Sequence, residues 1–263
     1  GGRGGDAEKA ATRLQAQRTR IARAIARCGT DEDALMAAHD DAIRSLKLAG
    51  VGDETVGPER LAHLRAMQKL QPGDPRTEGW RVDLILLLLD EGEAGEARSL
   101  LVGWGEEVCK AAPFAYSRAL IELAALHGEE EGASREVALT EMKLAVAANP
   151  YIAIFLAQMD TFATEIDPDT QPPPEETAKG GTVEEALGYT AAAGGCWMDF
   201  NDNGEASEIA AEALEEIEVE WPPRSAGVSK KYVKIFEAAS AAAEREAEQE
   251  GSDDEEEEEG EEG

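Results

Sequence analysis

The sequence is poor in cysteine and histidine. Only three cysteines occur in 263 residues, namely Cys28, Cys109 and Cys196. They are odd in number and far apart, which argues against a disulfide framework and indicates a reducing compartment. Without ligand pairs or an adjacent base, they are expected to be small buried hydrophobic residues rather than zinc ligands or reactive thiols. We therefore expect no metal, no cofactor, and a cytoplasmic or nuclear location.

Basic residues and long apolar runs are also scarce. The chain carries 25 Lys and Arg against 56 Asp and Glu, a formal net charge of −31, so a nucleic acid is not expected as a partner. The apolar run from Leu84 to Leu89 has six residues, whereas a membrane-spanning helix needs about 20. Neither a transmembrane segment nor a secretory signal is expected. Because the chain begins with Gly1 rather than Met, a missing N-terminal targeting segment stays open.

Apolar residues instead recur with the period of an α-helix, most clearly over residues 58–150. Trp80, Leu84, Leu87 and Leu88 are spaced to lie on one helical face. Leucine is a strong helix former, and only one residue of the six-residue run is β-branched. This stretch is therefore predicted to be a buried helix rather than a strand, with the three leucines in the core.

A turn and a second helix follow. Gly92 and Gly95 supply the turn, and the small side chain of Ala97 lets the helix that begins at Glu96 approach closely. Similar pairs recur in this region, and the last of them is closed by Pro150. This order of helix, Gly-containing turn, helix with an inner Ala, and Pro is typical of tetratricopeptide repeats. We expect an all-α fold of stacked antiparallel helix pairs, a tetratricopeptide-like α-solenoid with disordered termini; the helical pattern also leaves a coiled coil open.

Helix breakers and composition divide the chain. Four prolines over residues 168–174 predict a loop, and 13 of the last 20 residues are acidic, a pattern that stays disordered. Helices are expected at 6–28, 30–49, 59–70, 80–89, 114–127, 135–148, 151–163, 182–194, 204–217 and 229–250, with a loop at 50–57. The expected organisation is disordered residues 1–5, a helical-repeat array over 6–165, a Pro-rich loop over 166–181, a smaller helical portion over 182–250 and a disordered acidic tail over 251–263.

Several short stretches resemble one family in their order. The matching pieces include Leu70-Gln71-Pro72, Glu96-Ala97-Arg98 and, most specifically, Asn149-Pro150-Tyr151 in its context. From about residue 61 to 213, the chain is similar to tetratricopeptide-like proteins related to the suppressor-of-tumorigenicity-seven group. It departs from that pattern after Tyr151, where Phe155-Leu156-Ala157-Gln158 replaces a Gly-ended segment. The resemblance implies stacked helix pairs; the Cys-rich zinc finger of some relatives has no counterpart here.

One segment has the beginning of a calcium-binding loop. Asp199, Asn201 and Asn203 alternate before Gly204, as in the first half of an EF-hand loop. The twelfth position of such a loop is a bidentate Glu, but here it is Ala210. An Asp/Asn/Gly turn before a helix is therefore the favoured interpretation.

The remaining candidate residues do not form a catalytic pattern. The four tryptophans, Trp80, Trp104, Trp197 and Trp221, are spaced on apolar helices and are expected in the core. His39, His63 and His127 have no Ser or Cys nucleophile motif nearby, and the glycines of residues 1–5 follow no strand that would make a phosphate loop. We predict no catalytic, cofactor-binding or metal-site residues, and a protein that is not an enzyme.

The two ends of the chain have opposite charge. The first 30 residues carry seven Lys and Arg against two acidic residues. The basic face of the helix expected there is either solvated, or it binds a membrane surface or a target protein. We expect this helix to attract the acidic tail loosely.

These patterns favour a non-catalytic protein-interaction scaffold that presents a helical groove. Two alternatives stay open: an acidic-tail chaperone or adaptor for basic proteins, and a regulatory subunit or fragment whose active part lies outside this chain. The identity of the protein partner and the oligomeric state are not indicated.

Overall fold

A computed structural model describes residues 3–48, 53–70, 79–159 and 179–227, together with isolated positions between 230 and 245. Throughout these residues the secondary structure is helical, without strands, which confirms the predicted all-α class. The acidic tail and nearly all of the Pro-rich loop lie outside the described residues, as does most of the helix expected at 229–250. The chain divides into two compact units, residues 1–104 and 105–263, so one unit boundary falls inside the range expected to be a single array.

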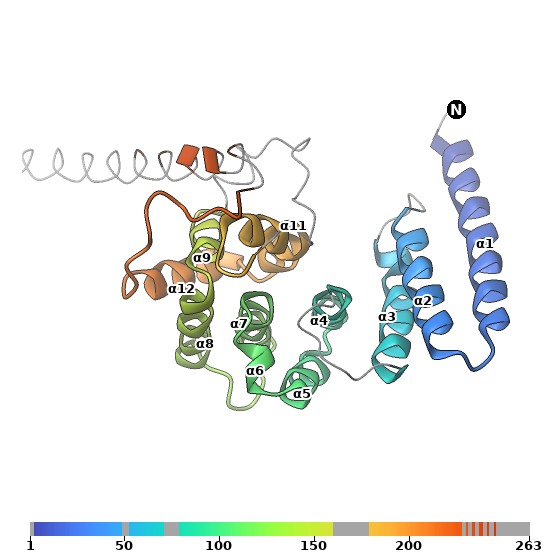
Figure 1. The fold of residues 1–263 in the computed structure, drawn as a ribbon, viewed down its shortest axis with the longest axis horizontal. Coiled ribbons are helices and arrows are strands. Elements are labelled where there is room, and N and C mark those ends of the chain that lie inside the picture. The colour runs from blue at the N-terminus through green and yellow to red at the C-terminus, as the bar shows by residue number, and fades with distance from the viewer. Residues whose placement is uncertain are drawn as a thin grey trace, which may run out of the picture. The chain divides into compact units, whose positions relative to one another are not determined.

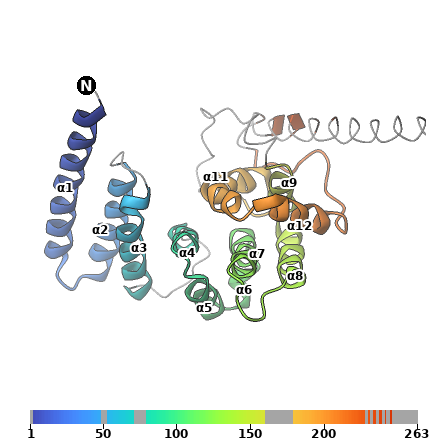
Figure 2. The ribbon, with the colours of Figure 1, turned by 180° about the vertical axis from the view of Figure 1, so that it is seen from behind.

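Unit 1 consists of helices that each pack on the next one in the chain. Figures 1 and 2 show its first three helices side by side and antiparallel. The helices are α1 (Arg3–Cys28), α2 (Glu32–Lys47), α3 (Asp53–Leu70), α4 (Trp80–Asp90) and α5 (Ala94–Trp104).

Local signals explain several of these boundaries. The Asp31 side chain accepts a hydrogen bond from the Ala34 amide and caps α2, a role that aspartate favours. Gly92 turns the chain between α4 and α5 with φ +76°, a conformation that favours glycine. Several expected boundaries are wrong. Helix α1 already begins at Arg3, and α3 begins at Asp53 inside the expected loop, with Pro58 within the helix. The helix expected at 182–194 continues through its two glycines to Asp199.

The core of unit 1 is built from leucines and alanines. Leu14, Leu46 and Val56 bring α1, α2 and α3 together in one cluster. In α4 the predicted core residues are buried, but so is every residue from Leu84 to Leu89. The expectation of a single apolar face is therefore wrong for α4, which is enclosed on more than one side. Ala97 of α5, predicted to allow close approach, is also fully buried.

An arginine shares this core. Arg81 is 1% exposed, and its guanidinium carbon lies 4.5 Å from the Trp80 ring centroid and 5.3 Å from that of Trp104. Its Nη1 donates a hydrogen bond to Gln68 Oε1 at 2.9 Å. These cation–π contacts and the hydrogen bond offset the cost of removing the charge from water. Trp80 and Trp104 are therefore half-buried beside a cation, instead of lying fully in the core as expected.

In unit 2, the helices expected to form a smaller C-terminal portion pack directly on the helices that precede them in the chain. Helix α7 packs on α8, α8 on α9, α11 on α9, and α12 on both α8 and α9. The described helices are α6 (Glu106–Cys109), α7 (Ala112–His127), α8 (Arg135–Ala148), α9 (Pro150–Ala157), α11 (Val183–Asp199) and α12 (Glu205–Leu214), with a 3₁₀ turn at Asp202–Gly204. Trp197 is fully buried and donates its indole N–H to Tyr189 Oη at 3.2 Å. Trp221 is 57% exposed, so its predicted core position is wrong.

Candidate functional site

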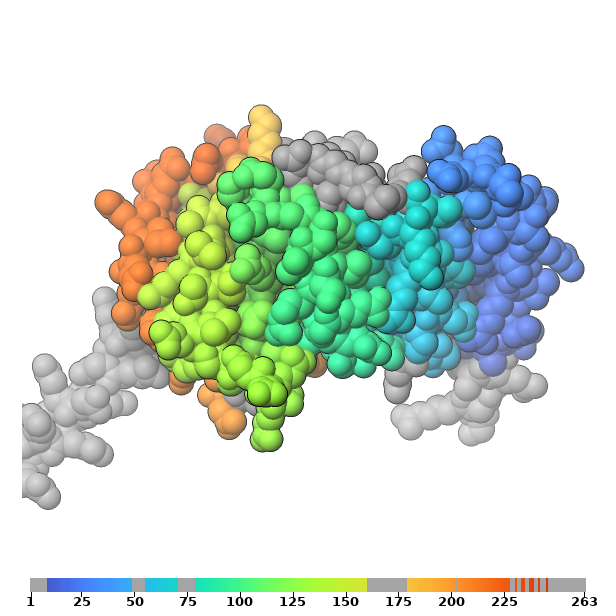
Figure 3. Space-filling model, turned by 90° about the horizontal axis from the view of Figure 1, so that it is seen from below, coloured from blue at the N-terminus to red at the C-terminus, as the bar shows by residue number. Residues whose placement is uncertain are grey.

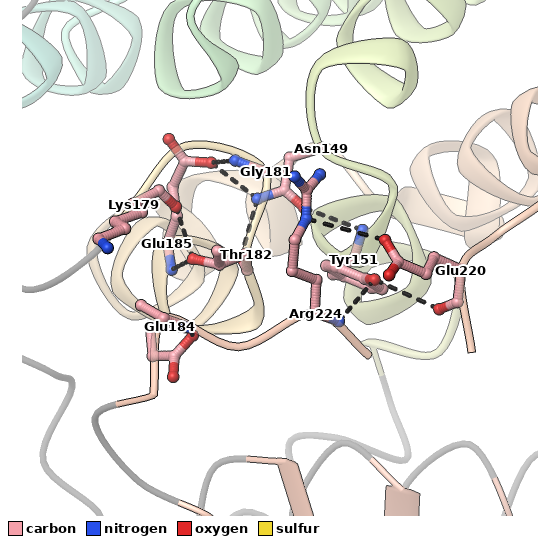
Figure 4. Close-up of polar contacts among 10 residues, drawn as sticks. Asn149, Tyr151, Lys179, Gly181, Thr182, Glu184, Glu185, Glu220 and Arg224 are labelled. Carbon is pink, nitrogen blue, oxygen red and sulfur yellow. Dashed lines mark hydrogen bonds and ion pairs between the residues drawn. The ribbon is translucent and has the colours of Figure 1, made fainter. Parts of the chain in front are cut away.

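Among the described residues, a well-connected polar cluster lies around Asn149, between α8 and α9 (Figure 4). Asn149 is fully buried. Its Oδ1 accepts from the Tyr151 amide at 3.1 Å and so caps α9, while Nδ2 donates to Thr182 O at 3.0 Å and to Glu185 Oε2 at 2.8 Å. One amide side chain thereby joins the end of α8, the start of α9 and the start of α11.

The start of α11 is held by the same carboxylate. Glu185 Oε2 also accepts from the Gly181 amide at 2.7 Å, and Thr182 Oγ1 accepts from the Glu185 amide at 3.4 Å. Thr182 is therefore the N-cap of α11. Burial raises the pKa of the Glu185 carboxyl, and the hydrogen bonds from Asn149 and Gly181 oppose that shift. The bonds from two donors keep this half-buried acid in place.

The chain that follows α12 returns to this cluster. Tyr151 Oη accepts from the Arg224 amide at 2.8 Å and donates to Glu220 O at 3.3 Å. Glu184, which is fully buried, accepts from the Ala226 amide at 2.8 Å and from the Ser225 hydroxyl. Residues 220–226 are therefore bonded to both α9 and α11, as Figure 4 shows for Tyr151 and Arg224.

The chemistry of this cluster is structural. Tyr116 Oη donates to Asn149 O at 2.8 Å, and burial raises the pKa of the Tyr116 and Tyr189 hydroxyls well above the ordinary value, so both stay protonated donors. The carboxylates of Glu184 and Glu185 are used for main-chain and side-chain bonds within unit 2. We infer that the cluster fixes the helix ends rather than acting on a substrate.

The segment that resembles a calcium loop is a helix cap in the structure. Asn201 Oδ1 accepts from the Ser207 amide at 3.0 Å at the start of α12. Ala210, at the position of the missing Glu, is buried on α12. In the described part of the chain, no three or more His, Cys, Asp or Glu side chains gather as a metal site. The segment ends at Gly204, which has φ +80°, and Asn201 bonds to the first turn of α12.

The three cysteines are free thiols and half-buried. The Cys28 thiol donates to the main-chain oxygens of Ala24 and Ala34. Burial raises the pKa of the Cys109 thiol, which lowers its thiolate fraction and its reactivity. This agrees with a packing role, although none of the three is as deeply buried as expected.

His39 of α2 and His63 of α3 form a pair that the sequence did not predict. The Nδ1 atoms of His39 and His63 are 2.9 Å apart, and the ring centroids are 5.1 Å apart. A hydrogen bond between two imidazoles needs a donor N–H on one ring and a free lone pair on the other. Burial lowers the pKa of both rings; the neighbouring His39 lowers that of His63 further, whereas Glu59 raises it. The neutral pair is thus the form that the fold favours.

This pair is expected to make unit 1 sensitive to mild acid. A group whose folded pKa is lowered stabilises the fold above its unfolded pKa of about 6.5, and that stability is lost as the pH falls through the folded pKa. Between pH 7.5 and 5.5, the normal chain should lose about 1 kcal/mol more unfolding free energy than the His39→Gln/His63→Gln variant, the worth of one hydrogen bond. Urea unfolding at both pH values measures this, with His127→Gln as the control in unit 2. Equal pH dependence of the normal chain and the double variant would contradict it.

One helix of unit 2 exposes an uncharged ridge. Val137, Thr140, Leu144 and Ala147 are spaced to lie along one side of α8 and all are exposed; Leu144 is 57% exposed. We call these four residues the α8 ridge. The yellow-green atoms of this part of the chain lie at the surface in Figure 3.

Ion pairs border the α8 ridge on both sides. Arg118 of α7 pairs with Glu141 at 2.8 Å. On the side of α12, Arg135 pairs with Glu212 at 2.7 Å and Lys143 with Glu216 at 2.5 Å. These ion pairs join α8 to its neighbours in the fold, whereas the four uncharged side chains of the α8 ridge face solvent, with the exposed Glu136 beside them. An apolar strip with a charged border is typical of a protein-binding surface.

Comparisons of the chain with protein-family models, with curated proteins and with solved structures find no match. Within the described residues, each helix is too short or too polar to cross a membrane.

Proposed function

We propose that this chain is a non-catalytic interaction protein of the tetratricopeptide-like class, related to the suppressor-of-tumorigenicity-seven group. Three features support the class. Consecutive helices pack on one another throughout unit 1 and from α6 to α9 in unit 2, Gly92 makes a tight turn between α4 and α5, and Ala97 and Ala145 are fully buried on the second helices of the pairs α4/α5 and α7/α8. Small residues at such crossings are a feature of tetratricopeptide repeats.

The α8 ridge carries the functional part of the proposal. Its exposed side chains are apolar or uncharged, although the chain as a whole has 31% charged residues. A partner helix with an apolar face fits such a surface, because knobs of the partner pack along the strip while its polar side chains meet the bordering ion pairs. The proposed function is the binding of a helical segment of another protein at the α8 ridge.

Photo-crosslinking tests this directly. A benzoylphenylalanine in place of Leu144 should crosslink to a discrete partner in cells, and the same residue in place of the exposed Leu48 of unit 1 should not. Leu144→Glu should abolish partner capture because it places a charge in the apolar strip, while leaving the unfolding free energy within about 0.5 kcal/mol, as for other surface changes. If Leu144→Glu retains all partners that Leu48→Glu retains, the α8 ridge is not the binding surface.

A further inference from the structure

The imidazoles of His39 and His63 face one another where α2 packs on α3, two helices that lie side by side in unit 1 (Figure 1). Their Nδ1 atoms are 2.9 Å apart, whereas the ring centroids are 5.1 Å apart. The two nitrogens therefore lie between the rings. Histidine is the commonest metal ligand in proteins and binds through a neutral ring nitrogen, so two nitrogens in this position can hold an ion as well as a hydrogen bond.

The spacing of the two nitrogens is close to that of a metal-bound pair. Zinc binds imidazole nitrogen at about 2.0–2.1 Å with tetrahedral angles, which places two ligand nitrogens about 3.3 Å apart. Starting from 2.9 Å, the Nδ1 atoms of His39 and His63 need to separate by only about 0.4 Å to reach that distance. A tilt of the two rings is enough for so small a change, and neither helix has to move.

The rings are also in the protonation state that a metal requires. A ligand nitrogen must carry a lone pair rather than a proton, and burial lowers the pKa of both rings, which favours their neutral forms. In the neutral pair, one ring donates its Nδ1–H to the other. On metal binding this ring takes its other tautomer, with the proton on Nε2. Both Nδ1 atoms then carry a lone pair, and the pair releases no proton.

The surroundings of the pair suit a cation. Glu59 lies one turn before His63 on α3, and its negative charge raises the pKa of His63, which means that it favours positive charge at that ring. Arg18 of α1 holds the Glu59 carboxylate in place. Both histidines are half-buried, so water can reach an ion bound to them. Among the described residues, no three or more His, Cys, Asp or Glu side chains gather as a metal site, so the protein supplies two ligands and water supplies the others.

We propose that His39 and His63 form a two-histidine site for a zinc ion, which links α2 to α3 through the two Nδ1 atoms. Calcium and magnesium do not fit this site, because they prefer oxygen ligands. The two residues are 24 apart on different helices, so the sequence pattern did not indicate a metal site. Without the ion, the pair keeps the hydrogen bond and the acid sensitivity described above. The site lies in unit 1 and is independent of partner binding at the α8 ridge of unit 2.

Calorimetric titration of the full chain with zinc chloride tests the proposal, with no affinity tag on the protein. Excess magnesium in the buffer occupies sites made only of carboxylates, which matters in a chain with 56 acidic residues. The normal chain should bind zinc under these conditions. Loss of a group that only supports a metal ligand already costs about 10–100-fold in affinity, so His39→Gln and His63→Gln should each weaken zinc binding at least about tenfold. His127→Gln, in unit 2, should leave it unchanged.

Two further measurements do not depend on the single variants. Cobalt in place of zinc should give the visible absorption of nitrogen and oxygen ligands, without the strong near-ultraviolet band of a cysteine thiolate. Zinc should raise the urea midpoint of the normal chain, because an ion that binds only the folded state stabilises it. EDTA should reverse this rise, and the His39→Gln/His63→Gln variant, once circular dichroism has verified its fold, should show none.

Four outcomes would overturn the proposal. The normal chain could bind no zinc in excess magnesium, or the two single variants could bind it as tightly as the normal chain does. His127→Gln could weaken binding as much as they do, which would indicate a general effect of removing a histidine. A thiolate band in the cobalt spectrum would assign the ion to a cysteine instead.

Discussion

Leu88→Ala is expected to lower the unfolding free energy by about 2–5 kcal/mol, the usual range for truncation of a packed leucine. Leu88 has no exposed surface and lies in α4, a helix in which all residues from Leu84 to Leu89 are buried. The truncation therefore opens a cavity that neighbouring side chains fill only in part. Urea unfolding followed by far-ultraviolet circular dichroism measures the loss.

The matched control for this change is Leu48→Ala. Leu48 is the same residue type in the same unit but is 82% exposed, so its truncation should change the unfolding free energy by no more than about 0.5 kcal/mol. An unchanged transition for Leu88→Ala, or equal losses for both variants, would contradict the packing of α4.

Asn149→Ala is expected to cost about 2–4 kcal/mol. The substitution removes the cap of α9, worth about 1 kcal/mol. It also removes one hydrogen bond from the Thr182 carbonyl and one from the Glu185 carboxylate, each worth about 0.5–1.5 kcal/mol. Both acceptors keep a main-chain donor, from Ala186 and Gly181 respectively. Thermal and urea unfolding of the variant measure the sum.

Two further variants divide this cost into its parts. Asn149→Ser keeps an oxygen for the Tyr151 amide but not the two donor hydrogens, so its loss should fall between those of the normal chain and Asn149→Ala. The Ser134 hydroxyl caps α8 by accepting one hydrogen bond from the Val137 amide. Ser134→Ala removes this cap and should cost about 1 kcal/mol. If Asn149→Ala costs no more than Ser134→Ala, the cluster adds nothing beyond an ordinary cap.

Local signals predicted much of the helical fold. The expected helix at 135–148 has the bounds observed for α8, because a serine cap begins it and Asn149-Pro150 ends it. The helix expected from Thr30 begins two residues later as α2, with Asp31 as its cap, and the helix expected from Thr182 begins at Val183 with Thr182 as its cap. Such signals act over three or four residues, which is the range that a sequence pattern reports.

Features that depend on tertiary contacts could not be predicted. Arg81 and Glu184 are charged residues on helices, and their burial depends on partners such as Gln68 and Ala226 that are distant in sequence. The histidine pair joins residues 24 apart, and periodicity does not say which faces of α2 and α3 meet. The sequence marks Asn149 as a helix end and as part of the family resemblance, but not its bonds to Thr182 and Glu185, which are more than 30 residues away.

The contact of Arg81 with Trp80 and Trp104 gives unit 1 an optical reporter. A guanidinium held over an indole alters its emission, and both tryptophans lie beside the same cation. Replacing Trp197 and Trp221 of unit 2 by phenylalanine would leave emission from this pair alone. The fluorescence spectrum would then follow the opening of the α4 core separately from that of the helices after residue 104, without any attached dye.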